Sequence, residues 1–260
     1  MTNTFSSHVS DVLVVGCGAA GLTSALRLAD AARVTVLAKG PLSEGSTYYA
    51  QGGISAVLDD QDSLESHIED TLVAGAGLCH ARSVRFTVEH APESIEWLIQ
   101  HGVAFTTEAR ANGSVDYHLT REGGYRPSSS RALGGLHGSS PIQTNLEEHA
   151  RQHPNIVLRD HHSAIDLITT GKMGLSGNRC LGAYVLNQHT GEVEVFSARL
   201  VVLGWKWRSQ PSIPLFQSRW FYWRWQCHGL ASRLPCCQYG IYAISPHLPL
   251  SSPGQIVLSH

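Results

Sequence analysis

The sequence predicts an α/β fold of the Rossmann-like, dinucleotide-binding kind, and three observations near the start of the chain predict it. The apolar run Val12–Val15 is typical of a short strand buried on both faces. The glycine-rich stretch GCGAAG at 16–21 follows directly, and apolar residues then recur at helical spacing from Leu22 to Ala29. A second apolar run, Val34–Leu37, completes a strand–turn–helix–strand pattern.

The glycine-rich stretch fits GxGxxG, and each glycine has a separate structural role. Gly16 allows the tight turn, Gly18 lets the backbone approach a pyrophosphate, and Gly21 permits close packing of helix on strand. The diphosphate charge would rest on the amides and the positive dipole end of a helix that starts near Ala19. In this context we predict a nucleotide-binding turn rather than a chance glycine-rich loop.

Lys39 stands at the end of the second strand, where the simple NAD pattern has an acidic residue that binds the ribose hydroxyls. A cation at this position suits a phosphate, or an adenosine that is held in a different way. A solvated lysine that caps the strand is the alternative, and the sequence leaves the two open.

The composition favours a globular domain that binds small ligands. The chain has 260 residues, is 42% hydrophobic and carries a formal net charge of -2 with its basic residues scattered. We therefore expect neither nucleic acid nor a membrane as partner, and no apolar run is long enough to span a bilayer. The six cysteines form no CxxC pair and no secretory signal precedes them, which predicts a reducing cytoplasm. The fifteen histidines form no metal-binding pattern, so no metal is expected.

Four stretches resemble one flavoprotein family, which includes L-aspartate oxidase and the flavoprotein subunits of succinate dehydrogenase and fumarate reductase. They are GCGAAGL at 16–22, EGSTYYAQGGISAV at 44–57, HIEDTLVAGAGLC at 67–79 and YHLTREGG at 117–124. The resemblance covers about residues 11–124 closely, and L-aspartate oxidase is its nearest branch. It implies an FAD-binding domain that is incomplete, because the capping and helical C-terminal domains of the family are expected to be absent.

The resemblance implies FAD as the cofactor, held without a covalent bond. The loop 46–53 offers hydroxyls, an amide and unhindered backbone NH groups that suit a flavin and its phosphates, and an ordinary polar loop is the alternative. Relatives that bind FAD covalently use a histidine where this chain has Ser46. The cofactor-binding residues expected from motif and resemblance are Gly16, Cys17, Gly18, Ala19, Ala20, Gly21, Lys39, Ser46, Thr47, Tyr48, Tyr49, Ala50, Gln51, Gly52 and Gly53.

The stretch 120–124 is expected to face the substrate. Glu122 matches the family's glutamate that faces the substrate's amino group, and Arg121 is a weaker candidate; without the resemblance, the two would be read as a surface ion pair. The activity implied is FAD-dependent oxidation of L-aspartate to iminoaspartate, with oxygen or fumarate as acceptor, as the first step of de novo NAD biosynthesis. Quinolinate synthase is the protein partner implied by family analogy. The alternatives are a soluble fumarate reductase or succinate dehydrogenase-like flavoprotein, and a non-catalytic nucleotide-binding fragment.

The middle of the chain is interpreted as scaffold. Helices are predicted over 83–100 and 143–153, and Pro92 either kinks the first or opens a second helix. The predicted strands are 155–158, 180–187 and 192–203, the last two joined by a turn at 189–191. The serine- and glycine-rich segment 125–142 has no match in the family and is interpreted as a flexible loop.

The tail after Leu203 departs from the family. Relatives continue this strand into a turn of small residues, whereas here Gly204 is followed by a segment, Trp205–Trp225, that holds five of the six tryptophans. A Trp/Arg surface that stacks on nucleic-acid bases is one interpretation. A shifted reading frame explains more, because TGG, the only tryptophan codon, always gives glycine when read one base late.

Back-translation of residues 208–254 with permitted codons tests this idea. Read one base late, an allowed choice of codons contains the stretches GDG, AMAWRAGCR, NMEF and QFHPT, which occur in the family's continuation. We therefore expect an FAD-binding domain over 1–203 and a disordered, out-of-frame tail over 204–260. A chain with only part of the active site is expected to be inactive.

Overall fold

The computed structural model describes residues 6–49, 54–58, 62–109, 115–121, 131–133, 140–204 and 256–258. They fall into two compact units. Unit 1 comprises the described residues of 1–46, 146–204 and 256–258, and unit 2 comprises those of 47–145. This division differs from the domain boundary after residue 203, which stays a prediction.

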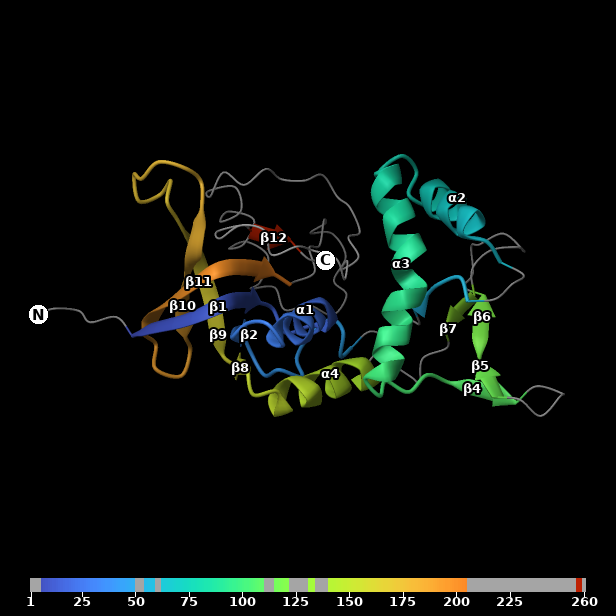
Figure 1. Ribbon diagram of the computed structural model, residues 1–260, viewed down its shortest axis with the longest axis horizontal. Coiled ribbons are helices and arrows are strands. Elements are labelled where there is room, and N and C mark those ends of the chain that lie inside the picture. Colours follow the sequence, from blue (N-terminus) through green and yellow to red (C-terminus); the bar gives the residue numbers. More distant parts are fainter. Residues whose placement is uncertain are drawn as a thin grey trace, which may run out of the picture. The chain divides into compact units, whose positions relative to one another are not determined.

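The elements of each unit are labelled in Figure 1. Unit 1 contains β1 (Ser7–Val15), α1 (Ala19–Ala29), β2 (Val34–Leu37), most of α4 (Ser140–Gln152), β8 (Ile156–Arg159), β9 (His162–Thr169), β10 (Cys180–Asn187), β11 (Val193–Leu203) and β12 (Ile256–Leu258). Unit 2 contains β3 (Ile54–Ser55), α2 (Leu64–Ala74), α3 (Ala81–Gln100), β4 (Thr107–Ala109), β5 (Val115–Tyr117), β6 (Leu119–Arg121) and β7 (Arg131–Leu133).

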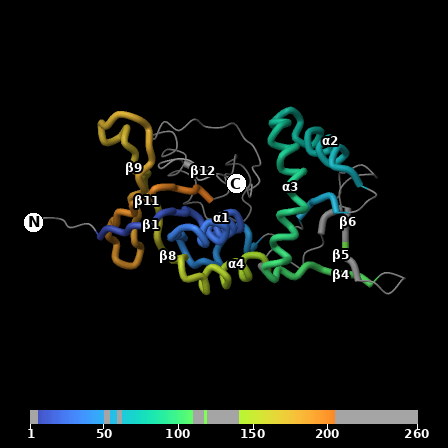
Figure 2. The backbone as a smooth tube through the Cα atoms, in the orientation of Figure 1, coloured from blue at the N-terminus to red at the C-terminus, as the bar shows by residue number. Residues whose placement is uncertain are grey.

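Unit 1 is built on one sheet with strands in the order β8-β2-β1-β11-β10-β9, and β12 also pairs with β11. Strands β8, β2, β1 and β11 are parallel, whereas β10 and β9 continue the sheet in antiparallel fashion. The chain leaves β1 toward β2 on one side and later returns to β11 on the other side (Figure 2). Parallel sheets bind ligands at such a reversal, beyond the carboxyl ends of the strands.

The register of the sheet places the carboxyl ends of β1, β2 and β11 level with one another. Val15, the last residue of β1, pairs with Leu37 of β2 on one side and with Leu203 of β11 on the other. The segment Val12–Val15 is at most 7% exposed, because it is flanked by strands on both sides and covered on both faces. The prediction of a doubly buried strand is therefore confirmed, and whatever follows the three strand ends gathers at one edge of the sheet.

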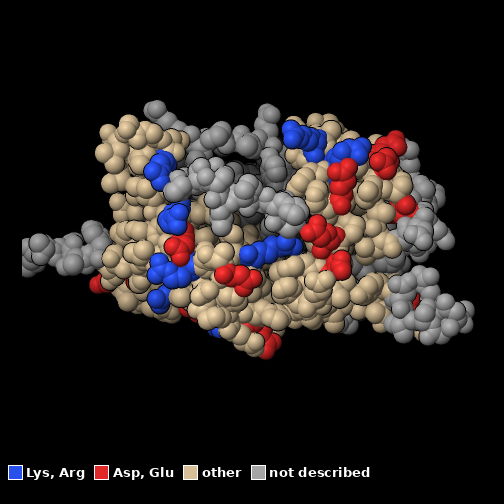
Figure 3. Space-filling view, in the orientation of Figure 1, with Lys and Arg blue, Asp and Glu red and all other residues tan. Residues whose placement is uncertain are grey.

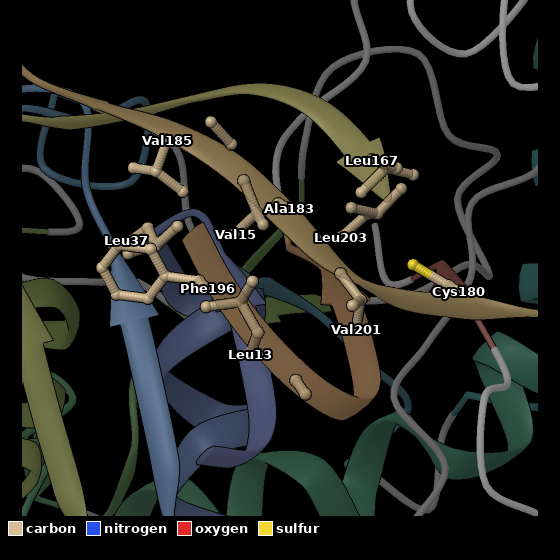
Figure 4. Packing of buried hydrophobic residues seen from close by; sticks show 12 residues of the cluster. Leu13, Val15, Leu37, Leu167, Cys180, Ala183, Val185, Phe196, Val201 and Leu203 are labelled. Carbon is tan, nitrogen blue, oxygen red and sulfur yellow. The ribbon is translucent and has the colours of Figure 1, made fainter. Parts of the chain in front are cut away.

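The core of unit 1 lies between the parallel strands and the antiparallel β9–β10 pair. Phe196 of β11 is 1% exposed and belongs to the same buried cluster as Leu13 and Val185, which come from different strands (Figure 4). Helix α1 contributes its own apolar stripe: Leu22, Ala25 and Ala29 are each 0% exposed. The helical spacing from residue 22 to 29 thus predicted the buried face correctly.

Unit 2 is organised around the helices α2 and α3. Ile68 of α2 packs against Val84 and Val88 of α3, and Ser63 caps α2 by accepting a hydrogen bond from the NH of Ser66 at 3.1 Å. Helix α3 continues through Pro92 as one element, which decides between the two predicted alternatives. The short strands form two small sheets, β3-β7-β6 and β4-β5.

Strands β9 and β1 of unit 1 differ from the prediction in ways that their pairing explains. Strand β9 (His162–Thr169) was not predicted, because polar residues interrupt its apolar residues, although burial still alternates along most of its length. Strand β1 begins at Ser7, well before the apolar run, since its first residues pair with β11 alone and not with β2. Strand β10 has the predicted bounds, and α4 begins three residues earlier than predicted.

The face drawn in Figure 3 shows no block of charges of one sign. On the face in Figure 3, Lys and Arg side chains are interspersed with Asp and Glu. Among the described residues, no helix combines the length and the apolar character needed to cross a bilayer. Within the same residues, no group of three His, Cys, Asp or Glu side chains is arranged to hold a metal ion.

Candidate cofactor site

The turn between β1 and α1 is as tight as the sequence predicted. Gly16 has a φ of 113°, a conformation that favours glycine, and its NH donates to the carbonyl of Leu37 at 2.9 Å. A Cβ on Gly21 would lie 1.9 Å from the carbonyl oxygen of Gly16, far inside contact distance. The motif therefore holds backbone against backbone, which is the packing role predicted for Gly21.

The start of α1 is suited to an anion. Gly18 is the N-cap in extended conformation and provides no side-chain cap, and the first turn carries no acidic residue. The positive end of the helix dipole is therefore not offset by a neighbouring side chain of the helix. Residues Gly18, Ala19 and Ala20 are half-buried at this end of the helix. Together they present backbone NH groups and small side chains, which an anion can approach closely.

Gly204 is a fourth glycine at this place, although the sequence predicts that it belongs to the tail. Its NH donates to the carbonyl of Val15 at 2.8 Å, so it continues the pairing of β11 with β1. A Cβ on Gly204 would lie 2.8 Å from the Cα of Gly21 and 3.6 Å from the carbonyl oxygen of Gly16. The signal that could have found it is a glycine directly after the buried strand Val201–Leu203.

We call Gly16, Gly18, Gly21 and Gly204 the glycine cradle. Its members come from the ends of β1 and β11 and from the first turn of α1. Because β2 ends at the same level, the residues that follow Leu37 lie at the same edge of the sheet. This geometry fits the diphosphate of a dinucleotide, and bulkier residues at positions 21 and 204 would fill the cradle.

Cys17 is buried beside the cradle. Its Sγ donates to the carbonyl of Leu42 at 3.5 Å, which ties the glycine-rich turn to the loop after β2. Burial raises the pKa of the Cys17 thiol to about 11. The thiol therefore stays protonated near neutral pH and serves as a structural donor, not as a nucleophile.

Lys39 follows β2 at the same edge of the sheet. The residue is exposed overall, yet partial desolvation of its ammonium lowers its pKa, an effect that the nearby Glu44 opposes. The carbonyl of Lys39 accepts a hydrogen bond from the side-chain amide of Gln188 at 2.5 Å. The lysine thus lies where the adenosine of a dinucleotide is held in this kind of fold.

The polar loop 46–53 is described as far as Tyr49. Ser46 ends the first part of unit 1, and Thr47, Tyr48 and Tyr49 begin unit 2. The rings of Tyr48 and Tyr49 meet edge to face with centroids 5.2 Å apart. Four further predicted residues of this loop lie outside the described residues, namely Ala50, Gln51, Gly52 and Gly53.

Unit 2 brings two of the predicted regions into one small sheet. Strand β3 follows the polar loop directly, and β6 carries Thr120 and Arg121; both pair with β7. Neighbouring strands lie about 4.8 Å apart, so β3 and β6 are about 10 Å apart. Arg121 is described through its backbone only, and Glu122 lies outside the described residues. The sheet therefore places Ser55, which follows the polar loop closely, and Thr120, the start of the predicted substrate stretch, opposite the same residue of β7, Ala132.

The fold and the glycine cradle define a dinucleotide-binding α/β protein. A family model described as an FAD binding domain matches residues 11–234, and the chain belongs to this family. FAD is therefore the cofactor. The close backbone packing of the cradle is of the kind that suits a dinucleotide's diphosphate.

Curated relatives are similar over most of this chain. L-aspartate oxidase of Pseudomonas aeruginosa is 55% identical over 196 residues, which are 74% of this chain and 36% of the relative. L-aspartate oxidase of Yersinia pestis is 52% identical over 200 residues, or 76% of this chain and 37% of the relative. The chain thus spans little more than a third of the length of these relatives.

Solved structures share the fold. Quinol fumarate reductase of E. coli superposes with a TM-score of 0.66 at 26% identity, covering 76% of this chain and 32% of that one. A flavocytochrome c3 fumarate reductase in an open conformation superposes with a TM-score of 0.63 at 27% identity, over 76% of this chain and 34% of that one. Both likenesses agree with the family assignment.

Proposed function

We propose that the chain is the FAD-binding part of an L-aspartate oxidase, which oxidises L-aspartate to iminoaspartate. The observation that carries the proposal is the glycine cradle at the level carboxyl ends of β1, β2 and β11. Similarity to L-aspartate oxidases at 50–55% identity supports this substrate over other dicarboxylates. The reaction would be the first step of de novo NAD biosynthesis, carried out in the cytoplasm.

Different residues of this chain would contact different parts of the cofactor. The cradle and the start of α1 would hold the diphosphate, and Lys39 would hold the adenosine half. The loop 46–53 would contact the flavin. The binding would be non-covalent, because Ser46 has no ring nitrogen with which to form the bond that histidine makes in covalent relatives.

The substrate would be oriented by charge. Glu122 would attract the ammonium of L-aspartate, with Arg121 as a weaker contact to a carboxylate. FAD, when bound, would supply a two-electron acceptor for the hydride of the substrate's Cα, and oxygen or fumarate would be the final acceptor. This chain's contribution is to bind and orient the two partners. Quinolinate synthase, which would use the product, is the proposed protein partner.

We further propose that residues after about Leu203 are translated out of frame. The shifted reading of 208–254 and the tryptophan-rich stretch support this. The 260-residue chain would then lack part of the active site and be inactive. Sequencing the DNA over codons 195–215 tests this directly: codons that cannot give the shifted string would refute the frame shift.

The cofactor proposal is tested with the purified 260-residue protein. We expect flavin absorbance that is released as free FAD on denaturation, because no covalent bond forms. A colourless protein that does not bind added FAD would overturn the proposal. A flavin that stays attached after denaturation would refute non-covalent binding alone.

A soluble fumarate reductase is the second candidate, favoured by the superposition on two fumarate reductases. The two activities are separated with a chain in which the frame is restored. An oxidase turns over L-aspartate and forms hydrogen peroxide, whereas a fumarate reductase oxidises a reduced dye in the presence of fumarate. Oxidation of the dye without turnover of L-aspartate would refute the oxidase and support the fumarate reductase.

A further inference from the structure

Three consecutive carbonyls after β2 are held by hydrogen bonds from distant parts of unit 1. The carbonyls of residues 38–40 accept, in order, from the backbone NH of His162 at 2.7 Å, the side-chain amide of Gln188 at 2.5 Å and the backbone NH of His161 at 3.3 Å. The middle donor is a side chain, so a substitution can remove it without altering the backbone. That middle carbonyl belongs to Lys39.

The amide of Gln188 is held in place from two sides. Its Nε2 also donates to the hydroxyl of Ser163 at 2.7 Å, and its backbone NH donates to the carbonyl of His161 at 2.9 Å. Gln188 therefore joins the β10–β11 turn to the start of β9 and to the segment after β2. These contacts fix the rotamer in which the Gln188 side chain reaches Lys39. Because the side chain is already ordered, it loses little conformational entropy when a ligand binds.

The turn that carries Gln188 is itself braced by Asn187. Its Oδ1 accepts from the backbone NH groups of His189 at 3.0 Å and Thr190 at 3.4 Å. Its Nδ2 donates to Glu194 Oε1 at 2.8 Å, and Glu194 is 7% exposed. The position of Gln188 is thus set by a turn whose own hydrogen bonds reach into the core.

We propose that Gln188 is a positioning residue for the adenosine half of the cofactor, acting through Lys39. The inference rests on the proposed function, in which Lys39 contacts FAD. A hydrogen bond to the Lys39 carbonyl fixes the peptide plane between residues 39 and 40, and so limits the directions that the Lys39 side chain can take. Without that bond the ammonium must be ordered when the ligand binds, which weakens binding.

The test is a double-mutant cycle in the full 260-residue chain, with FAD and ADP affinities measured by calorimetry. The variants are Gln188→Ala, Gln188→Met, Lys39→Ala and the two combinations with Lys39→Ala. Gln188→Met keeps the approximate length and shape of the side chain, removes the donor and adds no charge. Glu192→Gln, in the same turn and exposed, is the matched control.

We expect both Gln188 variants to bind FAD and ADP about fivefold more weakly, which corresponds to the loss of one net hydrogen bond. In the Lys39→Ala background the same changes should have no effect, because the side chain through which Gln188 acts is gone. A merely structural role would give the same loss in both backgrounds. The control should bind as the unaltered chain does.

The outcomes separate this inference from the function on which it rests. Equal losses with and without Lys39, or no loss in either Gln188 variant, would overturn the role of Gln188 while FAD binding stands. Lys39→Ala with unaltered affinity would also overturn it, since Lys39 would then not contact the ligand. An unaltered chain that binds neither FAD nor ADP would overturn the proposed function itself.

Discussion

The backbone of Gly21 packs so closely on Gly16 that a Cβ at residue 21 would lie 1.9 Å from the Gly16 carbonyl oxygen. Gly21→Ala should therefore force the first turn of α1 away from β1. We expect the free energy of unfolding to fall by about 3 kcal/mol, as for severe overpacking, and FAD binding to be lost. Urea denaturation and flavin titration measure the two effects.

Gly171→Ala is the matched control for this change. Gly171 lies in unit 1 after β9, and the atom nearest to an added Cβ would be Asn178 Oδ1 at 3.9 Å, an ordinary contact. This variant should bind FAD normally. If Gly21→Ala were as stable as Gly171→Ala and bound FAD equally well, the glycine cradle would not be the cofactor site.

Gly204→Ala tests whether the ordered sheet reaches past Leu203. A Cβ at residue 204 would lie 2.8 Å from the Cα of Gly21, so either β11 or α1 must shift. We expect a loss of about 1–3 kcal/mol in the free energy of unfolding and weaker FAD binding. A variant that matches the unaltered chain in both measurements would show that Gly204 belongs to the tail and not to the cradle.

The parts of the fold that could be predicted from the sequence are those set by local pattern. The run Val12–Val15 and the glycines after it specify strand, turn and helix within a few residues, so motif and structure agree. Strand β9 was missed because its burial arises from pairing with β10, which no local pattern in its mixed polar and apolar residues indicates. Tertiary pairing overrode propensity there.

The candidate site shows the same limit. Gly204 lies 188 residues after Gly16, and the tryptophan that follows it predicts a place in the tail, although β11 places it against Gly21. Gln188 is an exposed polar residue in a turn, and its contact with Lys39 spans 149 residues of sequence. Contacts of this separation follow from sheet topology, and a single sequence does not display them.

Cys17 should be inert to thiol reagents in the folded chain. Burial raises its pKa to about 11, so at pH 8 almost no thiolate forms and the reagent has no access. We expect iodoacetamide at pH 8 to leave Cys17 unlabelled in buffer and to label it in urea, with peptide mapping to identify the site. Cys79, which is only partly buried, is the internal comparison. Labelling of Cys17 as fast as Cys79 in buffer would contradict the burial of the turn.

Glu194 should make the stability of unit 1 depend on pH in the acidic range. Burial acts to raise its pKa, but hydrogen bonds from Asn187 and His8 outweigh this and lower it, helped by the nearby charge of His162. A pKa that is lower in the folded state stabilises the fold above the unfolded value of 4.5, and this contribution is lost as the pH falls through the folded value. Glu194→Gln should thus unfold about 1–2 kcal/mol more easily at pH 7, with the difference shrinking below about pH 4.

Urea denaturation of both proteins between pH 3 and pH 7 measures this dependence. Glu192→Gln, at an exposed position in the same turn, should run parallel to the unaltered chain throughout the range, because water screens a surface charge. The groups that face the Glu194 carboxylate are His8 from β1, His162 from β9 and Asn187 from β10. A constant difference between Glu194→Gln and the unaltered chain at all pH values would show that packing, and not the charge of Glu194, joins these strands.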